Sequence, residues 1–548
     1  MDESLRVAVV GAGVSGLAAV WGLNEYSSHS VSLFEPLSWL GGHANTVTFT
    51  PPTCASSASA PSTRVDTGFI VFNRVTYPNL LRFLQLTGVE ILDSDMSFSV
   101  TRHARAYGAF EWAGGSPAAL FCQPTNLLNP SHWRMVWDIV RFNQQAVDYL
   151  RLPHSGDEIS IGAWLDARHY SAGFRKNYLI PMTASIWSTA PETALASFPA
   201  LTLLRFMHNH HLLQILDRPQ WLTIKNGSRS YVDRITSKLP PHRIHQGPHK
   251  GAVQAAWIDD KGKWTIETAD GQHHPNFDRV IFATHADQTA AILRAGLRHS
   301  SSSLTETLAV LDRFGFSHNT AVLHADTRLM PVRRAAWSAW NFLAETQRGG
   351  DVDRVSLTYW MNLLQSLPEA KFGPVLVTLN PSTEPESPYT PRPELVVRRQ
   401  TYSHPIYTPD SVAAQHELQQ LQGGKGAFFV GAWTKYGFHE DGFASGLRAA
   451  AAIEGVYLPF DVRHAERAVP TTKQWGCIVA ETVDAIARCR VICLPVTMAF
   501  YVAFALLALV HALALVAAPR LVDAIATVKS HISNSLSPTT PAKRTKSA

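Results

Sequence analysis

Three glycines near the start of the chain have the spacing of a phosphate-binding turn. Gly11, Gly13 and Gly16 follow a short apolar strand, and a helix of small residues is expected directly after them. The first glycine of such a turn permits the tight reversal from strand to helix, the second lets the backbone approach a pyrophosphate, and the third allows close helix–strand packing. Glu35 ends the next predicted strand, 19 residues after Gly16, where a carboxylate can accept hydrogen bonds from ribose hydroxyls. These features together predict a dinucleotide site.

Two further glycine-containing segments could approach the same ligand. Gly42 and His43 follow the acidic residue closely, although an ordinary turn before a strand would have the same composition. Further along, an apolar strand runs into Gly431, and Glu440 and Asp441 precede a second helix of small residues. The N-terminus of that helix can direct backbone amides at an electron-rich ligand.

The composition restricts the remaining classes of function. A chain of 548 residues exceeds the size of a single core, so two or more domains are expected. The net charge of +5 is small and there is no basic stripe, so no nucleic-acid partner is predicted. Five cysteines without a C-x-x-C pair indicate a reducing compartment rather than a disulfide framework or a zinc site. The histidines at 208, 210 and 211 have no carboxylate or cysteine near them at ligand spacing, so no metal is predicted.

The C-terminal part of the chain contains one long apolar segment. Residues 491–518 hold no charged residue in 28 positions, which exceeds the roughly 20 apolar residues that cross a bilayer as a helix. We therefore expect a single-pass membrane helix there. Basic residues flank both ends of the segment, so charge alone does not orient it. Because the glycine turn begins within about ten residues of the start and leaves no room for a secretory signal, we expect the globular body to be cytosolic.

Taken together, the motifs resemble those of the flavin-containing amine oxidase / phytoene desaturase superfamily of FAD-dependent oxidoreductases. Within that superfamily the sequence is most similar to the branch labelled NAD/FAD-binding or amine oxidase domain-containing proteins. The matching segments are spread over residues 5–455 and comprise 41–47, 66–73, 329–337, 359–362, 377–381 and 431–442.

The resemblance implies an α/β fold with two domains, a Rossmann-type FAD-binding domain and a discontinuous α+β substrate domain. The FAD-binding domain is expected to comprise residues 1–90, 225–300 and 421–457, and the substrate domain residues 91–224 and 301–420. A linker over 458–490, the membrane helix over 491–518 and a flexible tail over 519–548 are expected to follow.

The resemblance also implies which residues meet the cofactor. The expected FAD contacts are Gly11, Gly13, Gly16, Glu35, Gly42, His43, Val253, Gly431, Glu440 and Asp441, and His43 stands where many relatives have arginine. Amine oxidases of the superfamily hold the amine between two aromatic rings in front of the flavin. The matching positions make Tyr402, Phe438 and His439 candidates for the flavin face, whereas the lysine that those enzymes place near the flavin has no clear counterpart.

The resemblance leaves the substrate and the electron acceptor open. The predicted membrane helix, the aromatic and aliphatic substrate domain and the similarity to desaturases favour hydride removal from a membrane-associated lipid or acyl-type substrate. The alternative is a membrane-tethered flavin amine oxidase that acts on a small amine, and a third interpretation is a non-catalytic FAD-binding protein. Oxygen, a quinone or a second protein could reoxidise the flavin.

Overall fold

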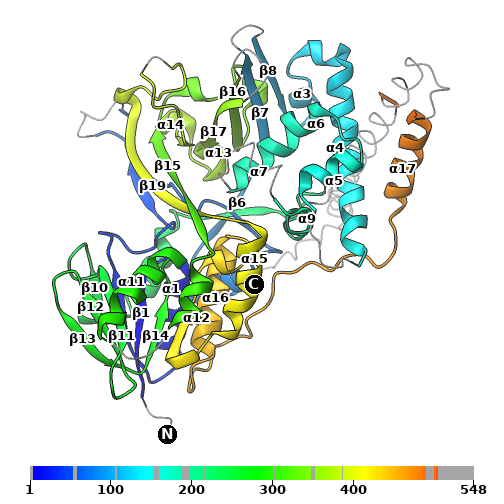
Figure 1. Cartoon of the computed structure of the whole chain (residues 1–548). Helices are drawn as coiled ribbons and strands as arrows, with labels where there is room; N and C mark the ends of the chain where they lie inside the picture. Colours follow the sequence, from blue (N-terminus) through cyan, green and yellow to red (C-terminus); the bar gives the residue numbers. More distant parts are fainter. Residues whose placement is uncertain are drawn as a thin grey trace, which may run out of the picture.

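The computed structural model describes residues 4–52, 59–104, 108–153, 159–187, 198–214, 218–299, 304–346, 352–385 and 387–488, together with residues 499, 502 and 503. The described chain forms two parts, one above the other in Figure 1. The lower part is built around a parallel sheet, and the upper part around a mixed seven-stranded sheet flanked by helices. This is the two-part α/β arrangement expected from the sequence.

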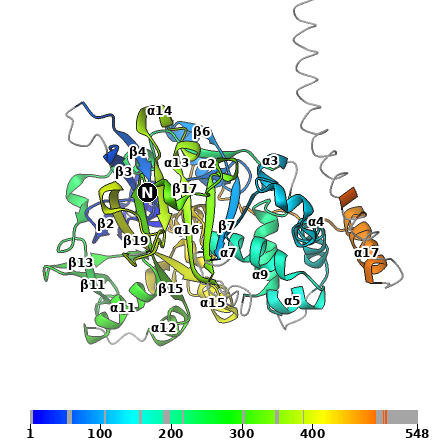
Figure 2. The same cartoon turned by 90° about the horizontal axis from the view of Figure 1, so that it is seen from above.

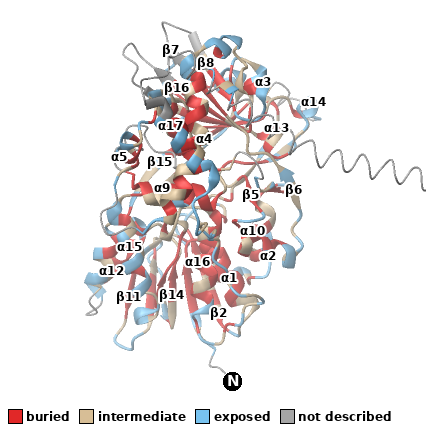
Figure 3. Ribbon diagram, turned by 90° about the vertical axis from the view of Figure 1, so that its right-hand side faces the viewer, coloured by how far each residue is buried: buried red, intermediate tan, exposed pale blue. Residues whose placement is uncertain are grey.

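Five parallel strands form the centre of the lower part, in the order β10–β2–β1–β14–β20. Along β1, Val7 and Val9 enter a core shared with helices α1 and α16, whereas Ala8 and Val10 enter a core shared with the β11–β13 sheet. Both faces of the sheet are therefore buried, which explains why its strands are almost continuously apolar. Figure 3 shows buried residues concentrated in these strands.

The elements of the lower part come from widely separated stretches of the chain. They are β1 (Arg6–Val10), α1 (Val14–Glu25), β2 (Ser30–Glu35), α2 (Pro78–Thr87), α10 (Arg229–Thr236), β10 (Ile244–Gln246), β11 (Val253–Ile258), β12 (Trp264–Thr268), β13 (His273–Phe277), β14 (Arg279–Phe282), α11 (Ala286–Gly296), α12 (Thr305–Leu311), α15 (Pro409–Gln420), β20 (Ala427–Phe429) and α16 (His439–Ala451). Two small sheets connect the parts, one formed by β3 (Thr46–Phe49) and β4 (Thr63–Asp66), the other by β5 (Phe72–Asn73), β9 (Trp221–Ile224) and β6 (Ile91–Ser94).

The upper part contains the seven-stranded sheet, in the order β19–β15–β18–β17–β16–β7–β8. Only the β16–β7 pair is parallel among the strands described. The strands are β7 (Phe98–Ala104), β8 (Gly108–Ala113), β15 (Gly315–His324), β16 (Trp340–Thr346), β17 (Val352–Trp360), β18 (Leu376–Leu379) and β19 (Val396–Ile406). The helices are α3 (Pro117–Leu120), α4 (Pro130–Arg151), α5 (Ile161–Ala167), α6 (Ala172–Phe174), α7 (Ile180–Trp187), α9 (Ala200–Asn209), α13 (Met361–Leu364) and α14 (Glu369–Phe372).

Two helices from the segment 301–420 pack on the lower part rather than on the upper one. Val310 and Leu311 of α12 and Leu418 of α15 belong to the same buried cluster as Phe282 and Phe429 of the parallel sheet. Helix α12 precedes β15 of the upper sheet, and α15 follows β19. The apolar face of each helix covers the parallel sheet of the lower part.

The segment 458–490, expected to be a linker, ends in helix α17 (Trp475–Arg488), which lies beside α4 at the edge of the upper part (Figures 1 and 2). Arg141 of α4 forms buried ion pairs with Asp138 and with Asp484 of α17, and the Trp137 indole NH donates to Asp484 at 3.4 Å. Removing one partner of such a buried pair is strongly destabilising, so these contacts attach α17 to the body.

The predicted membrane helix over 491–518 lies outside the described residues, apart from positions 499, 502 and 503. Within the described part of the chain, no helix combines the length and the apolar character needed to span a bilayer.

Candidate functional site

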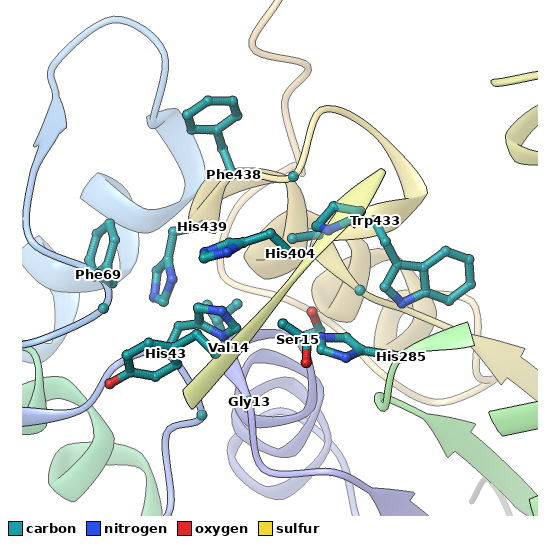
Figure 4. A pocket seen from close by; sticks show the side chains of 18 of the residues that line it. Gly13, Val14, Ser15, His43, Phe69, His285, His404, Trp433, Phe438 and His439 are labelled. Atoms are coloured by element: carbon teal, nitrogen blue, oxygen red, sulfur yellow. The ribbon is translucent and has the colours of Figure 1, made fainter. Parts of the chain in front are cut away.

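A cavity of about 480 Å³ lies between the carboxyl ends of the parallel strands and the upper sheet. Its floor is the glycine turn at the start of α1, and β19 crosses above it (Figure 4). Ligands of doubly wound α/β folds bind at this edge of the sheet.

The glycine turn has the geometry that the spacing predicts. Gly11 has φ +103°, and its N–H donates to the Phe34 carbonyl at 2.8 Å. A Cβ on Gly16 would lie 1.9 Å from the Gly11 oxygen, so only glycine allows α1 to start this close to the strand. A Cβ on Gly13 would meet no atom within 4 Å, because Gly13 faces the cavity. The first turn of α1 therefore presents unpaired amides to a ligand.

Glu35 lies at the end of β2 beside this turn. Its Oε2 accepts from Ala12 N–H at 2.8 Å and its Oε1 from Leu37 N–H at 3.0 Å. Burial raises the pKa of the Glu35 carboxyl, while these two backbone bonds oppose the rise. The carboxylate thus fixes the turn and still lines the cavity, where it can accept from a ribose hydroxyl.

The second glycine pair lies directly on the first motif. Gly41 N–H donates to the Ala12 carbonyl at 2.8 Å, and a Cβ on Gly42 would lie 3.1 Å from the Gly13 Cα. Gly42 has φ +58° and lines the cavity together with His43. The backbone therefore approaches the ligand space from two sides.

The segment after β20 closes the cavity on the side opposite His43. Gly431 lines the wall, and its N–H donates to Ser445 Oγ of α16 at 3.0 Å. The indole NH of Trp433 donates to the Thr284 carbonyl at 3.1 Å, which joins this segment to the end of β14. A Cβ on Gly431 would lie 2.2 Å from the Trp433 Nε1, so glycine is needed for this contact.

Four residues expected to contact FAD are not on the cavity wall. Glu440 accepts at 2.6–3.0 Å from Asn79 N–H, the Asn79 amide and Leu80 N–H, so its carboxylate caps α2. Asp441 accepts from Tyr436 and Phe438 N–H at 3.2 and 3.1 Å and closes the turn before α16. Val253 pairs with Thr268 within the β11–β12 sheet. Gly16, a fourth, is also absent from the wall because it is the packing glycine beneath it.

The three flavin-face candidates all line the cavity but belong to separate clusters. The Tyr402 ring packs on His43 with centroids 4.8 Å apart, and its hydroxyl contacts Thr67 Oγ1 at 2.7 Å. Phe438 stacks on Phe206 at 4.9 Å. His439 stacks on Phe69 at 3.6 Å, and its Nε2 contacts the Tyr231 hydroxyl at 2.7 Å.

Five histidines line the cavity, and Figure 4 labels four of them, His43, His285, His404 and His439. Burial, together with a smaller effect of neighbouring imidazoles, lowers the pKa of His43 and of His285 to about 4 and that of His404 to about 3. Burial also holds the pKa of His439 well below its usual value. All four rings are neutral at pH 7, so they act as hydrogen-bonding groups rather than as cations.

The sequence analysis missed His285, His404, Trp433 and Phe69 as wall residues. His285 lies three residues after the end of β14, on the loop where parallel strands present side chains to a ligand, and this signal could have identified it. His404 lies within β19 of the upper sheet, and no motif marks it.

The comparisons with known proteins agree with this geometry. Residues 9–86 match the family model described as an NAD(P)-binding Rossmann-like domain, and residues 380–454 match the model described as flavin containing amine oxidoreductase. The second match covers β20, the Gly431 segment and α16, which close the cavity. Together the two matches support the flavin-containing amine oxidase superfamily that the sequence motifs resemble.

The enzyme is thus an oxidoreductase with FAD as its cofactor, as the sequence predicted. The open cradle at Gly13, the acceptor at Glu35 and the two glycine segments fit the phosphates and the ribose of FAD. The cofactor supplies hydride acceptance, and the chain positions the substrate and tunes the ring. No curated protein sequence matches the chain.

Solved structures with the same fold have varied activities. Cyclohexylamine oxidase from Brevibacterium oxydans is 15% identical, with 82% of this chain and 98% of that chain covered and a TM-score of 0.53. A fatty acid isomerase from P. acnes that produces CLA is 12% identical, with 83% and 100% covered and a TM-score of 0.54. A putative protoporphyrinogen oxidase from Exiguobacterium is 15% identical, with 82% and 98% covered and a TM-score of 0.53. At these identities the likeness establishes the fold only.

Proposed function

We propose that this flavoenzyme removes a hydride from an uncharged, chain-like substrate of the lipid or acyl type. The observation that carries the proposal is the charge of the cavity wall. Among the described residues that line it, only Glu35 has a charged side chain, and Glu35 lies at the dinucleotide end. Burying a charged group without a partner is costly, so this cavity favours a neutral substrate.

The walls away from the dinucleotide end consist mostly of apolar and aromatic side chains. They include Met96, Phe206, Leu212, Trp221, Trp340, Tyr359 and Leu379. Several of these side chains belong to the main core of the upper part or pack against it, so the wall is continuous with a rigid interior. A wall of this kind gains free energy by removing an alkyl chain from water, about 0.8 kcal/mol per buried CH₂.

A small amine is the competing substrate class. Tyr402 and Phe438 would be the two rings that hold it, but they pack in different clusters, one with His43 and the other with Phe206. An ammonium group would also meet no carboxylate on the described substrate wall. Both observations favour the lipid over the amine.

We propose further that the enzyme works at a membrane. One support is the apolar segment 491–518. The other is the direction of α17, which runs antiparallel to α4: Lys473 contacts Asp148 near the end of α4, and Asp484 contacts Arg141 in its middle. The chain therefore leaves α17 near the start of α4, where Leu127 and Leu128 are 51% and 89% exposed. A cytosolic position for the body is supported by the free thiols of Cys122 and Cys477.

Anaerobic reduction of the bound flavin tests the substrate proposal. The full chain is purified in detergent, and the flavin absorbance is followed after addition of phospholipid or fatty acyl extracts, or of a panel of simple amines. We expect bleaching by a component of the lipid fraction. Rapid bleaching by amines, with none by lipids, would overturn the proposal.

Flotation with phosphatidylcholine vesicles tests the membrane proposal separately. The full chain should float with the vesicles and remain with them after washing with alkaline carbonate. Recovery in the soluble fraction would contradict membrane attachment without affecting the substrate assignment.

A further inference from the structure

A chain of hydrogen bonds runs from the upper sheet to the cavity and ends at His404. Thr320 N–H donates to Asn380 Oδ1 at 2.9 Å, and Asn380 Nδ2 donates to Asn319 Oδ1 at 2.7 Å. Asn319 Nδ2 then lies 2.8 Å from His404 Nδ1. Asn319 is 2% exposed, so solvent does not compete for its amide.

The Thr320 backbone amide determines which group donates in each hydrogen bond of this series. A backbone N–H can only donate, so the Asn380 oxygen must face Thr320 and its NH₂ must face Asn319. The Asn319 oxygen therefore accepts, and its NH₂ faces the imidazole. His404 Nδ1 must accept that bond, and the proton of the neutral ring is placed on Nε2.

His404 Nε2 lies on the side of the ring away from Asn319, and the ring lines the cavity (Figure 4). The ring also meets His43 edge to face, with centroids 5.3 Å apart. The geometry points to a specific role for His404: it is a fixed, neutral hydrogen-bond donor that meets an acceptor atom of the bound FAD. Asn319 and Asn380 are positioning residues that set its tautomer.

This inference rests on FAD binding but not on the proposed substrate. A neutral donor at the cofactor stabilises the electron-rich reduced flavin more than the oxidised form, because a hydrogen bond to a charged acceptor is stronger. It does so without placing a cation in a cavity that has no counter-ion on the substrate side.

Nitrogen-15 NMR of protein labelled at histidine tests the tautomer directly. Difference spectra between the natural protein and His404→Gln assign the His404 signals. We expect an unprotonated Nδ1 and a protonated Nε2 in flavin-free and flavin-bound protein alike. In Asn319→Asp, the new carboxylate can only accept, so Nδ1 should become protonated. A protonated Nδ1 in the natural protein, or an unchanged Nδ1 in Asn319→Asp, would overturn the assignment.

The reduction potential of the bound flavin tests the donor role. His404→Phe removes the donor, and we expect the affinity for reduced relative to oxidised flavin to fall roughly tenfold, about 30 mV for a two-electron couple. His404→Gln keeps an N–H donor and should shift the potential by less than half as much. His416→Gln, at an exposed position on α15 away from the cavity wall, is the control and should leave the potential unchanged. Equal shifts in the Phe and Gln variants, or no shift in either, would show that the donor does not meet FAD. Loss of lipid oxidation in a variant whose flavin keeps its normal reduction potential would bear on the proposed substrate and not on FAD binding.

Discussion

The two ends of the cavity are built in different ways. At the dinucleotide end, the surface is mostly backbone, and glycines bring Gly13 and Gly42 close enough that a Cβ would fall 3.1 Å from a neighbouring Cα. At the substrate end, the surface is side chain, contributed by β-strands and helices of the upper part. The dinucleotide end allows few residue types but recognises a feature shared by all dinucleotides. The side chains at the substrate end can vary widely while the fold is kept, which agrees with the varied activities of structures that share this fold.

The largest effect is expected from a change that disrupts only the dinucleotide end. Gly13→Asp places a carboxylate where a Cβ meets no protein atom, so the fold should persist while the negative charge repels the phosphates of FAD. We expect FAD affinity to fall at least about a thousandfold. Flavin absorbance after gel filtration measures retention, with circular dichroism as the control for folding. A yellow protein would mean that the phosphates bind elsewhere.

Acidification tests the buried imidazoles that lie between the two ends of the cavity. The pKa values of His43, His285 and His404 are lowered to about 4, 4 and 3 in the folded protein. The unfolded chain therefore binds more protons between pH 4 and about 6.5, so the free energy of unfolding should fall as the pH falls through this window. The expected loss is on the order of 3 kcal/mol for each ring.

Thermal unfolding followed between pH 4 and 8 measures this loss. His285→Gln should flatten the dependence on pH, whereas His416→Gln, at an exposed position on α15, should not. Identical slopes in all three proteins would show that the cavity histidines do not carry the effect.

A change outside the cavity wall should affect stability but not the cofactor. In Glu440→Gln, an NH₂ replaces one of the oxygens that accept from Asn79 and Leu80, so buried donors at the start of α2 lose a partner. We expect a cost of about 1–3 kcal/mol in the free energy of unfolding and an unchanged flavin spectrum. Loss of flavin from a folded variant would place Glu440 at the cofactor after all.

The smallest effect should come from altering charge at the substrate end. Leu212→Asp adds a carboxylate to a partly exposed wall position, and Leu212→Asn adds polarity without charge. We expect the rate of flavin reduction by lipid to fall about tenfold in the Asp variant, equivalent to about 1.4 kcal/mol, with less change in the Asn variant. FAD retention should be unaffected in both. A faster reaction with lipid in the Asp variant would contradict a neutral substrate.

The same contrast explains how much the sequence alone could reveal. Gly11, Gly13 and Glu35 were identifiable because backbone geometry imposes residue types at fixed spacing. The α/β architecture followed from the same signal and from the resemblance. The positions of Glu440 and His404 were not identifiable, because they depend on which buried donors from distant segments surround them. The motif identified the right segment for Glu440 but not the target of its side chain. His404 gains its role from Asn319, which lies in β15, and from Asn380, which follows β18.

The order of strands in the parallel sheet has a consequence for biosynthesis. β1 emerges first from the ribosome, but β20 and α16 are made some 420 residues later. A Cβ on Gly446 of α16 would lie 2.0 Å from the Ser15 oxygen of α1, so the first helix is not covered until that late segment arrives. Throughout translation, the apolar side of α1 and the outer edge of β14 lack their final partners. We therefore expect that the nascent chain needs protection by chaperones and acquires its flavin only after almost all of the globular body has been synthesised.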